Sequence, residues 1–184
     1  MNLEKKDIKI YILCGDARAG KDTSASIIRN TYEKNGLKAI NIQISSTIKE
    51  YAKVITGWGG SDEDKPRAFL QQLGTDLIRK KIDNDFFINR IIQDIEVYSY
   101  FYDCITISDV RFTLEVDSIK KKFKDALAIK VLRPNFDNGL TQEEKKHSTE
   151  TGLDGYDKYD YILVNDSTIE NLENKIYDML KELE

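Results

Sequence analysis

The chain has 184 residues, of which 40% are hydrophobic and 33% charged, with two prolines. This composition excludes a fibrous or disordered protein, and the length favours a single domain with one core. The formal net charge of −4 argues against a broad surface for DNA or RNA. The start of the chain, MNLEKKDIKIYIL, has only a short apolar run, so we expect no signal peptide, no membrane span and a cytoplasmic location.

Short apolar runs alternate with amphipathic stretches along the chain. In chain order, the pattern predicts a strand at 8–14, a helix at 21–34, a strand at 38–44, helices at 46–56, 66–82 and 85–99, a strand at 103–109, a helix at 114–123, strands at 126–132 and 159–164 on either side of a polar segment, and a helix at 167–183. This alternation indicates an α/β fold with a five-stranded parallel sheet and helices on both faces. Ligands in such folds bind beyond the carboxyl ends of the strands.

The stretch CGDARAGKDT joins the first predicted strand to the first predicted helix. Gly15, Gly20 and Lys21 have the spacing of a phosphate-binding P-loop, in the strand-to-helix context that this motif requires. Glycines let successive backbone N–H groups turn toward phosphates, and the helix amino terminus favours an anion. We therefore expect Lys21 to bind the β- and γ-phosphates of ATP. The predicted nucleotide contacts in this loop are Gly15, Ala17, Arg18, Ala19, Gly20, Lys21, Asp22 and Thr23.

The residue after the P-loop lysine departs from the usual motif. A serine or threonine normally stands there as the magnesium ligand, whereas this chain has Asp22, with a hydroxyl one place later at Thr23. A carboxylate is a good oxygen ligand for Mg²⁺ but adds negative charge near the phosphates. Both residues are candidate ligands, and the sequence does not choose between them. Asp109, at the end of the third strand, is a third candidate, with a simple turn aspartate as the alternative.

The P-loop segment GDARAGKDT resembles that of the phage-type deoxynucleoside monophosphate kinases, in which aspartate after the lysine is normal. The resemblance continues in the family's order over nearly the whole chain, through RAFLQQLGTDLIR (67–79), SDVRFTLEVDSI (108–119), HSTETGLDGY (147–156) and VNDSTIENL (164–172). Thr113 and Leu114 stand where that family has Pro and Asn, and Thr149 where it usually has Ser. The resemblance implies a three-layer P-loop kinase fold, with a monophosphate-binding region at about 45–100 and a lid at about 133–156.

Four side chains of the central region are candidates for binding the acceptor. A guanidinium at the carboxyl edge of the sheet can bind a phosphate in bidentate fashion, and the resemblance assigns Arg111 to the acceptor phosphate. The alternative is an ion pair between Arg111 and Glu115. Arg67, Gln71 and Arg79 lie near one face of the predicted helix, which suits phosphate and base contacts and also suits a solvated face.

The polar segment 133–156 is a candidate lid, because phosphoryl transfer requires the exclusion of water. Arg133 begins this segment, and we expect it to close over the transferred group. The only histidine, His147, is by itself most simply a solvated loop residue. The resemblance instead makes His147 and Glu150 substrate contacts.

Three further positions complete the predicted site. Gly74 allows the close approach of another backbone. Asn165 and Asp166 follow the fifth strand beside the P-loop, where they suit contact with an adenine edge, the capping of the last helix, or both. Ser167 and Glu170 have the spacing of a capping box for that helix.

The sequence thus predicts a magnesium-dependent kinase that moves the γ-phosphoryl group of ATP to a nucleoside monophosphate, with no nucleic-acid or membrane partner. The expected catalytic residues are Lys21, Arg111, Arg133 and Asp109. One alternative is a P-loop kinase for another small metabolite, such as phosphomevalonate or dephospho-coenzyme A. Another is a nucleotide-binding regulatory module with little turnover. The sequence leaves open whether the chain forms a homodimer.

Overall fold

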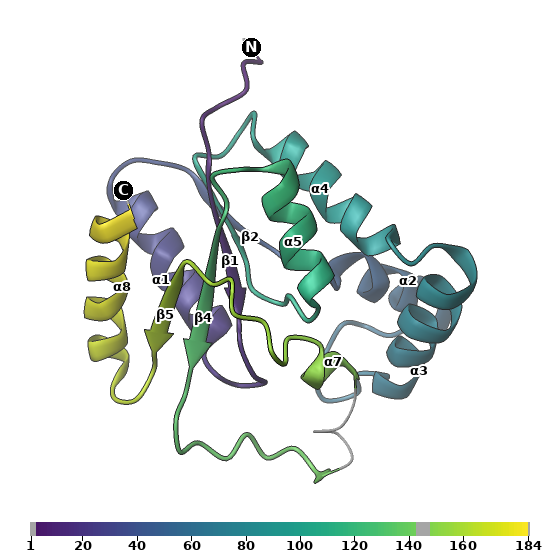
Figure 1. Cartoon of the computed structure of the whole chain (residues 1–184). Helices are drawn as coiled ribbons and strands as arrows, with labels where there is room; N and C mark the ends of the chain where they lie inside the picture. Colours follow the sequence, from purple (N-terminus) through teal and green to yellow (C-terminus); the bar gives the residue numbers. More distant parts are fainter. Residues whose placement is uncertain (1–2, 143–147, 184) are drawn as a thin grey trace.

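In the computed structural model, which describes residues 3–142 and 148–183, five strands form one sheet (Figure 1). They are β1 (Lys9–Cys14), β2 (Ala39–Ile42), β3 (Cys104–Ile107), β4 (Leu127–Leu132) and β5 (Tyr161–Val164). The strand order is β2-β3-β1-β4-β5, and every neighbouring pair is parallel. Because β1 is central, the loop that follows it emerges in the middle of the carboxyl edge.

Helices cover both faces of this sheet, as the sequence predicts. α1 (Lys21–Lys34) and α8 (Ile169–Leu183) lie on one face, and α4 (Phe86–Tyr98) and α5 (Thr113–Lys122) lie on the other (Figure 1). Side chains of a strand alternate between the two faces, and β1 supplies both cores in this way. Tyr11 and Leu13 pack in the core of α1 and α8, whereas Ile10 and Ile12 pack in the core of α4 and α5.

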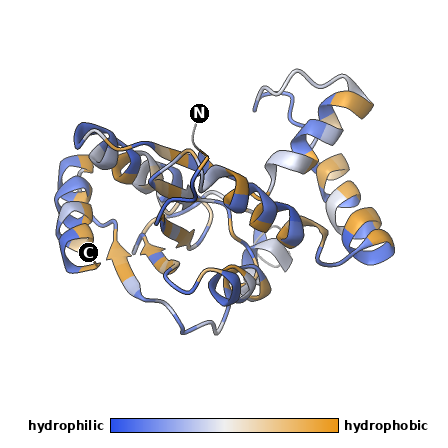
Figure 2. Ribbon diagram, turned by 90° about the horizontal axis from the view of Figure 1, so that it is seen from above, coloured by the Kyte–Doolittle hydropathy of each residue, from blue (hydrophilic) through white to orange (hydrophobic). Residues whose placement is uncertain are grey.

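A helical arm projects from the side of the sheet, formed by α2 (Ser46–Thr56), α3 (Arg67–Gln71) and η1 (Gln72–Ile82). Figure 2 shows the strands largely orange in the centre, with the arm apart from them at the right. The helix predicted at 66–82 is present, with α winding in α3 and π winding in η1, in which hydrogen bonds run to the fifth residue. Gly74 lies within η1, and a Cβ there would come within 2.6 Å of Ile48 Cδ1 on α2. The close approach predicted at Gly74 is therefore made by a side chain.

The segment between β4 and β5 carries the short helix α7 (Ser148–Thr151). This short helix lies below the carboxyl edge of the sheet, on the same side as the loop after β1 (Figure 1). Within residues 3–142 and 148–183, no helix combines the length and the apolar character that a membrane span needs.

Candidate active site

The loop between β1 and α1 has glycine where its backbone requires it. Gly15 and Gly20 have φ angles of 137° and 105°, a region that other residues rarely adopt. A Cβ at Gly15 would come within 2.3 Å of the carbonyl oxygen of Val131 on β4. A Cβ at Gly20 would come within 2.6 Å of the side-chain nitrogen of Asn165. The loop's path across the carboxyl edge therefore depends on both glycines.

Lys21 is the first residue of α1 and is 8% exposed. Its Nζ donates hydrogen bonds to the carbonyl oxygens of Gly15 and Asp16, at 2.8 and 2.7 Å. Burial lowers the pKa of Lys21 to about 8, and the positive charge of Arg111 adds to this effect. The loop thus holds an amine at a helix amino terminus, where an anionic ligand would favour its charged form.

The two aspartates predicted to serve magnesium have different partners. Asp22 Oδ1 accepts a 2.6 Å hydrogen bond from the hydroxyl of Ser108, which directly follows β3. Asp109, the next residue, instead accepts the backbone N–H groups of Ile44 and Ser45 on its two carboxylate oxygens, at 2.7 and 2.9 Å. Asp109 therefore anchors the loop after β2, a contact that the sequence did not predict, and its role toward magnesium stays a prediction.

A cavity of about 370 Å³ extends from the P-loop to the arm, within the size range of small-molecule sites. Its wall contains six of the predicted site residues: Asp22, Gln71, Gly74, Arg79, Asp109 and Arg111. Lys49 and Lys65 also line it, and sequence reasoning missed them because single lysines in a charged chain carry no positional signal. Arg67 is exposed at the start of α3, one helical turn before Gln71, and does not line this cavity.

Arg79 is held at the cavity wall by a buried carboxylate and two aromatic rings. Glu115 is 1% exposed and accepts a hydrogen bond from the Arg79 guanidinium at 2.7 Å. The centres of the Phe87 and Phe112 rings lie 5.1 and 4.8 Å from the guanidinium carbon. Glu115 also accepts the backbone N–H groups of Arg111 and Phe112. Glu115 thus ties η1 to the start of α5 and fixes the direction of Arg79.

The side chain of Arg111 pairs with α7. Its Nη1 donates to Glu150 Oε1 at 2.8 Å, whereas Glu115, the alternative partner, takes the backbone N–H of Arg111 instead. A Cβ at Gly152 would lie 2.4 Å from the carbonyl oxygen of Arg111, so α7 and its following turn pack directly on this residue. Two predicted substrate contacts, Arg111 and Glu150, are therefore together. His147, which the resemblance groups with Glu150, lies outside the described residues.

Two arginines join the P-loop to the segment after β4. Arg18 has a φ angle of 60°, and its Nη1 donates to the carbonyl oxygen of Asn138 at 2.7 Å. Arg133 is exposed, and its Nη1 donates to the carbonyl oxygen of Arg18 at 3.3 Å. The Arg133 guanidinium also stacks on Phe136, 3.6 Å from the ring centre. The first residues of the candidate lid therefore contact the P-loop.

Asn165 supports the P-loop from the end of β5. Its Nδ2 donates to the carbonyl oxygen of Ala19 at 2.9 Å. Asp166 instead accepts a 2.6 Å hydrogen bond from Lys175 of α8. The cap of α8 comes from Thr168, whose hydroxyl accepts the N–H of Asn171 at 3.2 Å, one residue later than the capping box predicted at Ser167.

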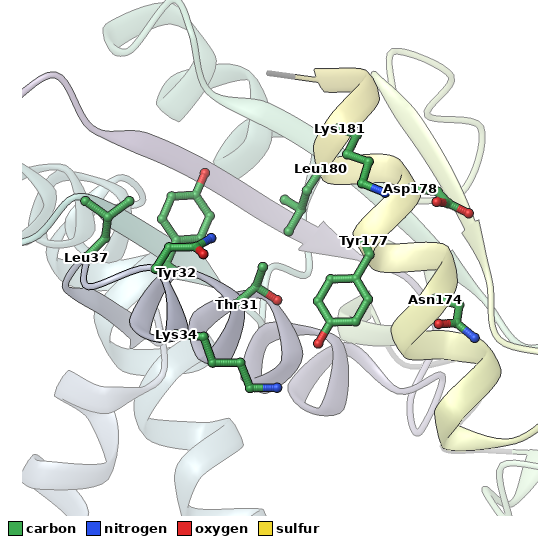
Figure 3. Close-up of a pocket in the computed structure, with 10 residues that line it drawn as sticks. Thr31, Tyr32, Lys34, Leu37, Asn174, Tyr177, Asp178, Leu180 and Lys181 are labelled. Carbon is green, nitrogen blue, oxygen red and sulfur yellow. The ribbon is translucent and has the colours of Figure 1, made fainter.

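A larger hollow of about 570 Å³ lies between the ends of α1 and α8 (Figure 3). Thr31 and Lys34 line it from α1, and Tyr177 reaches toward them from α8. Thr31 lies ten residues after Lys21, roughly 15 Å along the helix axis. Volume alone would favour this hollow, but it contains none of the residues that the sequence singles out. The cavity beside the P-loop is the candidate active site.

The family model and the two curated relatives that match this chain carry the same description. The family model described as deoxynucleotide monophosphate kinase matches residues 62–176. A putative deoxynucleotide monophosphate kinase of Acanthamoeba polyphaga mimivirus is 34% identical over 120 residues, which cover 60% of this chain and 58% of the relative. The deoxynucleotide monophosphate kinase of Enterobacteria phage T4 is 28% identical over 153 residues, or 83% of this chain and 58% of the relative. The alignments thus span 58% of the length of each of these curated relatives.

Solved structures share the fold at low sequence identity. An APS kinase of Mycobacterium tuberculosis, in complex with AMPPNP and APS, has a TM-score of 0.58 at 13% identity and covers 96% of this chain and 99% of its own. A dephospho-CoA kinase of Campylobacter jejuni has a TM-score of 0.51 at 13% identity, with 95% and 97% covered. These neighbours show the three-layer P-loop kinase fold that the resemblance implies. Because the family model matches more than half of the sequence, the chain belongs to the deoxynucleotide monophosphate kinase family.

Proposed function

We propose that this chain transfers the γ-phosphoryl group of ATP to a nucleoside monophosphate, with a deoxynucleotide as the preferred acceptor. The observation that carries the proposal is the cavity beside the P-loop, because its wall contains Asp22, which is next to Lys21, together with Arg79 and Arg111. A donor triphosphate and an acceptor monophosphate both need cationic groups, and this cavity brings two such groups to one space. Membership of the family supports the same reaction.

The P-loop is the proposed donor site. Its backbone N–H groups and Lys21 bind the β- and γ-phosphates, and the amino terminus of α1 adds a favourable dipole. Asn165 holds the loop in shape through the carbonyl oxygen of Ala19. An adenine contact by Asn165 or Asp166 stays a prediction.

The donor set beside the P-loop fits magnesium. Mg²⁺ in phosphotransferases is bound through one or two carboxylates together with substrate phosphates and water, and Asp22 supplies a carboxylate at the cavity wall. Within the described residues there is no cluster of three or more His, Cys, Asp or Glu side chains able to hold a metal by itself. We propose Asp22 as the protein ligand, with Thr23 as the alternative. When bound, magnesium supplies positive charge to the phosphates.

The arm is the proposed monophosphate-binding region. Arg79 and Arg111 bind the acceptor phosphate, and Gln71 offers an amide to the base. The ion pair between Arg111 and Glu150 must then rearrange when a phosphate arrives. Arg67 is exposed one helical turn before Gln71, and its contact with the acceptor stays a prediction.

Catalysis in this proposal depends on alignment and charge. An oxygen of the acceptor phosphate attacks the γ-phosphorus, the bond from the γ-phosphorus to the β–γ bridging oxygen breaks, and ADP leaves with that oxygen. Lys21 and Arg111 stabilise the charge on the transferred group. The lid, about 133–156, excludes water, and Arg133 closes over the transfer.

The test is ADP formation from Mg-ATP with a panel of ribo- and deoxyribonucleoside monophosphates. We expect turnover on one or a few deoxynucleotides, and a loss of a thousandfold or so in Lys21→Ala, on the scale of other charge-stabilising groups. Arg111→Ala should lose activity while its affinity for ATP changes little. A flat panel together with intact ATP binding would contradict the proposal and favour an acceptor of another class.

A further inference from the structure

The hydrogen bond between Asp22 and Ser108 reverses the usual arrangement of a P-loop site. In P-loop enzymes, magnesium is held by a serine or threonine of the loop and a carboxylate at the end of a strand. Here the loop carries the carboxylate, Asp22, and the strand end carries the hydroxyl, Ser108, and the two are 2.6 Å apart. The neighbouring carboxylate of Asp109 has other partners, because it accepts the backbone N–H groups of Ile44 and Ser45, one on each oxygen.

The direction of the Ser108 hydroxyl is fixed by a chain of hydrogen bonds. Ser108 is 2% exposed, and its oxygen accepts a hydrogen bond from Asn41 Nδ2 at 3.1 Å. The amide oxygen of Asn41 accepts in turn from the hydroxyl of Thr106, at 2.9 Å. Asn41 and Thr106 face one another in register on β2 and β3. Since the Ser108 oxygen is an acceptor from Asn41, its own proton goes to Asp22, and all three bonds point toward that carboxylate.

We propose that the carboxylate and the hydroxyl of a P-loop magnesium site have exchanged places in this chain, with Asp22 as the metal ligand and Ser108 as the residue that positions it. Thr106 and Asn41 orient Ser108 and so contribute indirectly to the position of Asp22. This inference rests on the proposed function only where that function requires Mg-ATP, and it is independent of the acceptor.

The proposed role of Ser108 has a physical basis in the demands of the metal. Mg²⁺ requires nearly ideal octahedral geometry, so a ligand that turns freely binds it less well. A hydrogen bond from Ser108 limits the rotation of the Asp22 carboxylate. Loss of that bond therefore weakens the metal-dependent part of ATP binding and spares the part that depends on Lys21 and the loop.

The test measures the affinity for a non-hydrolysable ATP analogue by calorimetry, once with Mg²⁺ and once with a chelator. The ratio of the two affinities is the metal-dependent gain. We expect Ser108→Ala to lower this gain by roughly tenfold, the order for one hydrogen bond to a charged group. Ser108→Thr, which keeps a hydroxyl, should retain most of it. Ser99→Ala is the matched control, because Ser99 is also buried and bonds only a backbone carbonyl, that of Glu96.

The exchange itself is tested by reversing it. Asp22→Ser should lose more of the gain than Ser108→Ala, and the double variant Asp22→Ser with Ser108→Asp should recover at least tenfold over Asp22→Ser. An unchanged gain in Ser108→Ala overturns the inference, as does equal affinity of the unaltered chain with and without Mg²⁺. If the double variant fails to fold, as circular dichroism would show, the comparison of Ser108→Ala with Ser108→Thr decides alone. A flat acceptor panel would overturn the kinase proposal and leave this measurement unaffected.

Discussion

The two ends of the cavity beside the P-loop are built from different parts of the chain. At the P-loop end, the key groups belong to one short loop: Gly15 and Gly20 with positive φ angles, and Lys21 bonded to loop carbonyls. At the arm end, side chains from distant elements converge. Arg79 comes from η1 and bonds to Glu115 of α5, which also accepts the backbone N–H of Arg111. Arg111, from the loop after β3, acts on both ends, because its charge also helps to lower the pKa of Lys21.

This difference predicts that substitutions at the two ends affect the protein in different ways. A site made of backbone is lost when the backbone moves, whichever nucleotide is bound. A site made of side chains can change its ligand one residue at a time while the fold persists. We therefore expect changes at the P-loop end to affect stability and all nucleotide binding, and changes at the arm end to affect the acceptor alone.

The largest effect should come from Gly15→Ala. The new Cβ would meet the Val131 carbonyl at 2.3 Å in a conformation that alanine avoids, so we expect a loss of about 3 kcal/mol or more of unfolding free energy. Affinity for the ATP analogue should fall below detection. Gly36→Ala is the control, with a φ angle of 76° and nothing within 4 Å of its Cβ, and should cost about 1 kcal/mol. Urea unfolding measures the free energy of unfolding of both variants. An equal loss in the two variants would contradict the special role of Gly15.

At the arm end, Arg79→Lys should raise the KM for the acceptor by roughly 10- to 100-fold. Lysine keeps the charge but loses the paired donors and the contacts with Phe87 and Phe112. Affinity for the ATP analogue should change less than about threefold, because the P-loop is untouched. Steady-state kinetics with each substrate varied in turn provide the check. A parallel loss of ATP affinity would show that the two ends are coupled.

As pH rises, the stability of the protein and its affinity for the ATP analogue should change in opposite directions because of Lys21. The pKa of Lys21 is lowered to about 8 in the free protein, so between that pH and its ordinary value near 10.5 the unfolded chain binds more protons. The contribution of Lys21 to stability therefore increases as pH rises through this window. Phosphate binding requires the protonated amine, so affinity for the ATP analogue should decrease over the same window.

Calorimetry in buffers of different ionisation heat measures the effect on Lys21 directly. Proton uptake on binding should be found at about pH 9 and should vanish in Lys21→Met. Stability of the unliganded protein is followed by urea unfolding across the same pH range. Affinity that is constant up to about pH 10 would contradict the assignment of this lysine to the phosphates.

The smallest effect should come from Glu150→Gln. The Arg111–Glu150 pair is partly exposed, and pairs of this kind contribute about 1 kcal/mol or less. If Glu150 competes with the acceptor phosphate for Arg111, its removal lowers the KM for the acceptor by a few-fold. Glu50→Gln, which breaks the exposed pair with Lys53, is the control and should leave the KM unchanged. A rise in KM would instead support the direct substrate contact that the resemblance implies for Glu150.

Much of the P-loop end could be predicted from the sequence, because its information is local. Helix α1 begins and ends where expected, at Lys21 and Lys34. The two glycines of the motif, Gly15 and Gly20, are the positions where the loop has positive φ angles that favour glycine. Each of the five strands lies within its predicted range. Short apolar runs between turn residues are typical of strands in a parallel sheet that is buried on both faces, so these runs could be assigned as strands.

The arm end and the surroundings of Asp22 were harder to predict from the sequence, because the residues that form them are far apart in the chain. The winding of η1 has no periodicity signal that separates it from an α-helix over eleven residues. Asn41 and Thr106 look like ordinary polar strand positions until the register places them opposite each other. Ser108 precedes the more conspicuous Asp109, and only the fold shows which of the two faces Asp22.

The contact between Asn165 and Ala19 has a consequence for the order in which the protein is assembled. Its two residues are 146 positions apart, so during synthesis the P-loop is made long before the amide that holds it. A nascent or truncated chain that ends before β5 would carry the whole glycine motif without the amide that bonds to Ala19. We therefore expect a chain that ends before β5 to be captured more weakly on an ATP-bearing resin than the whole chain.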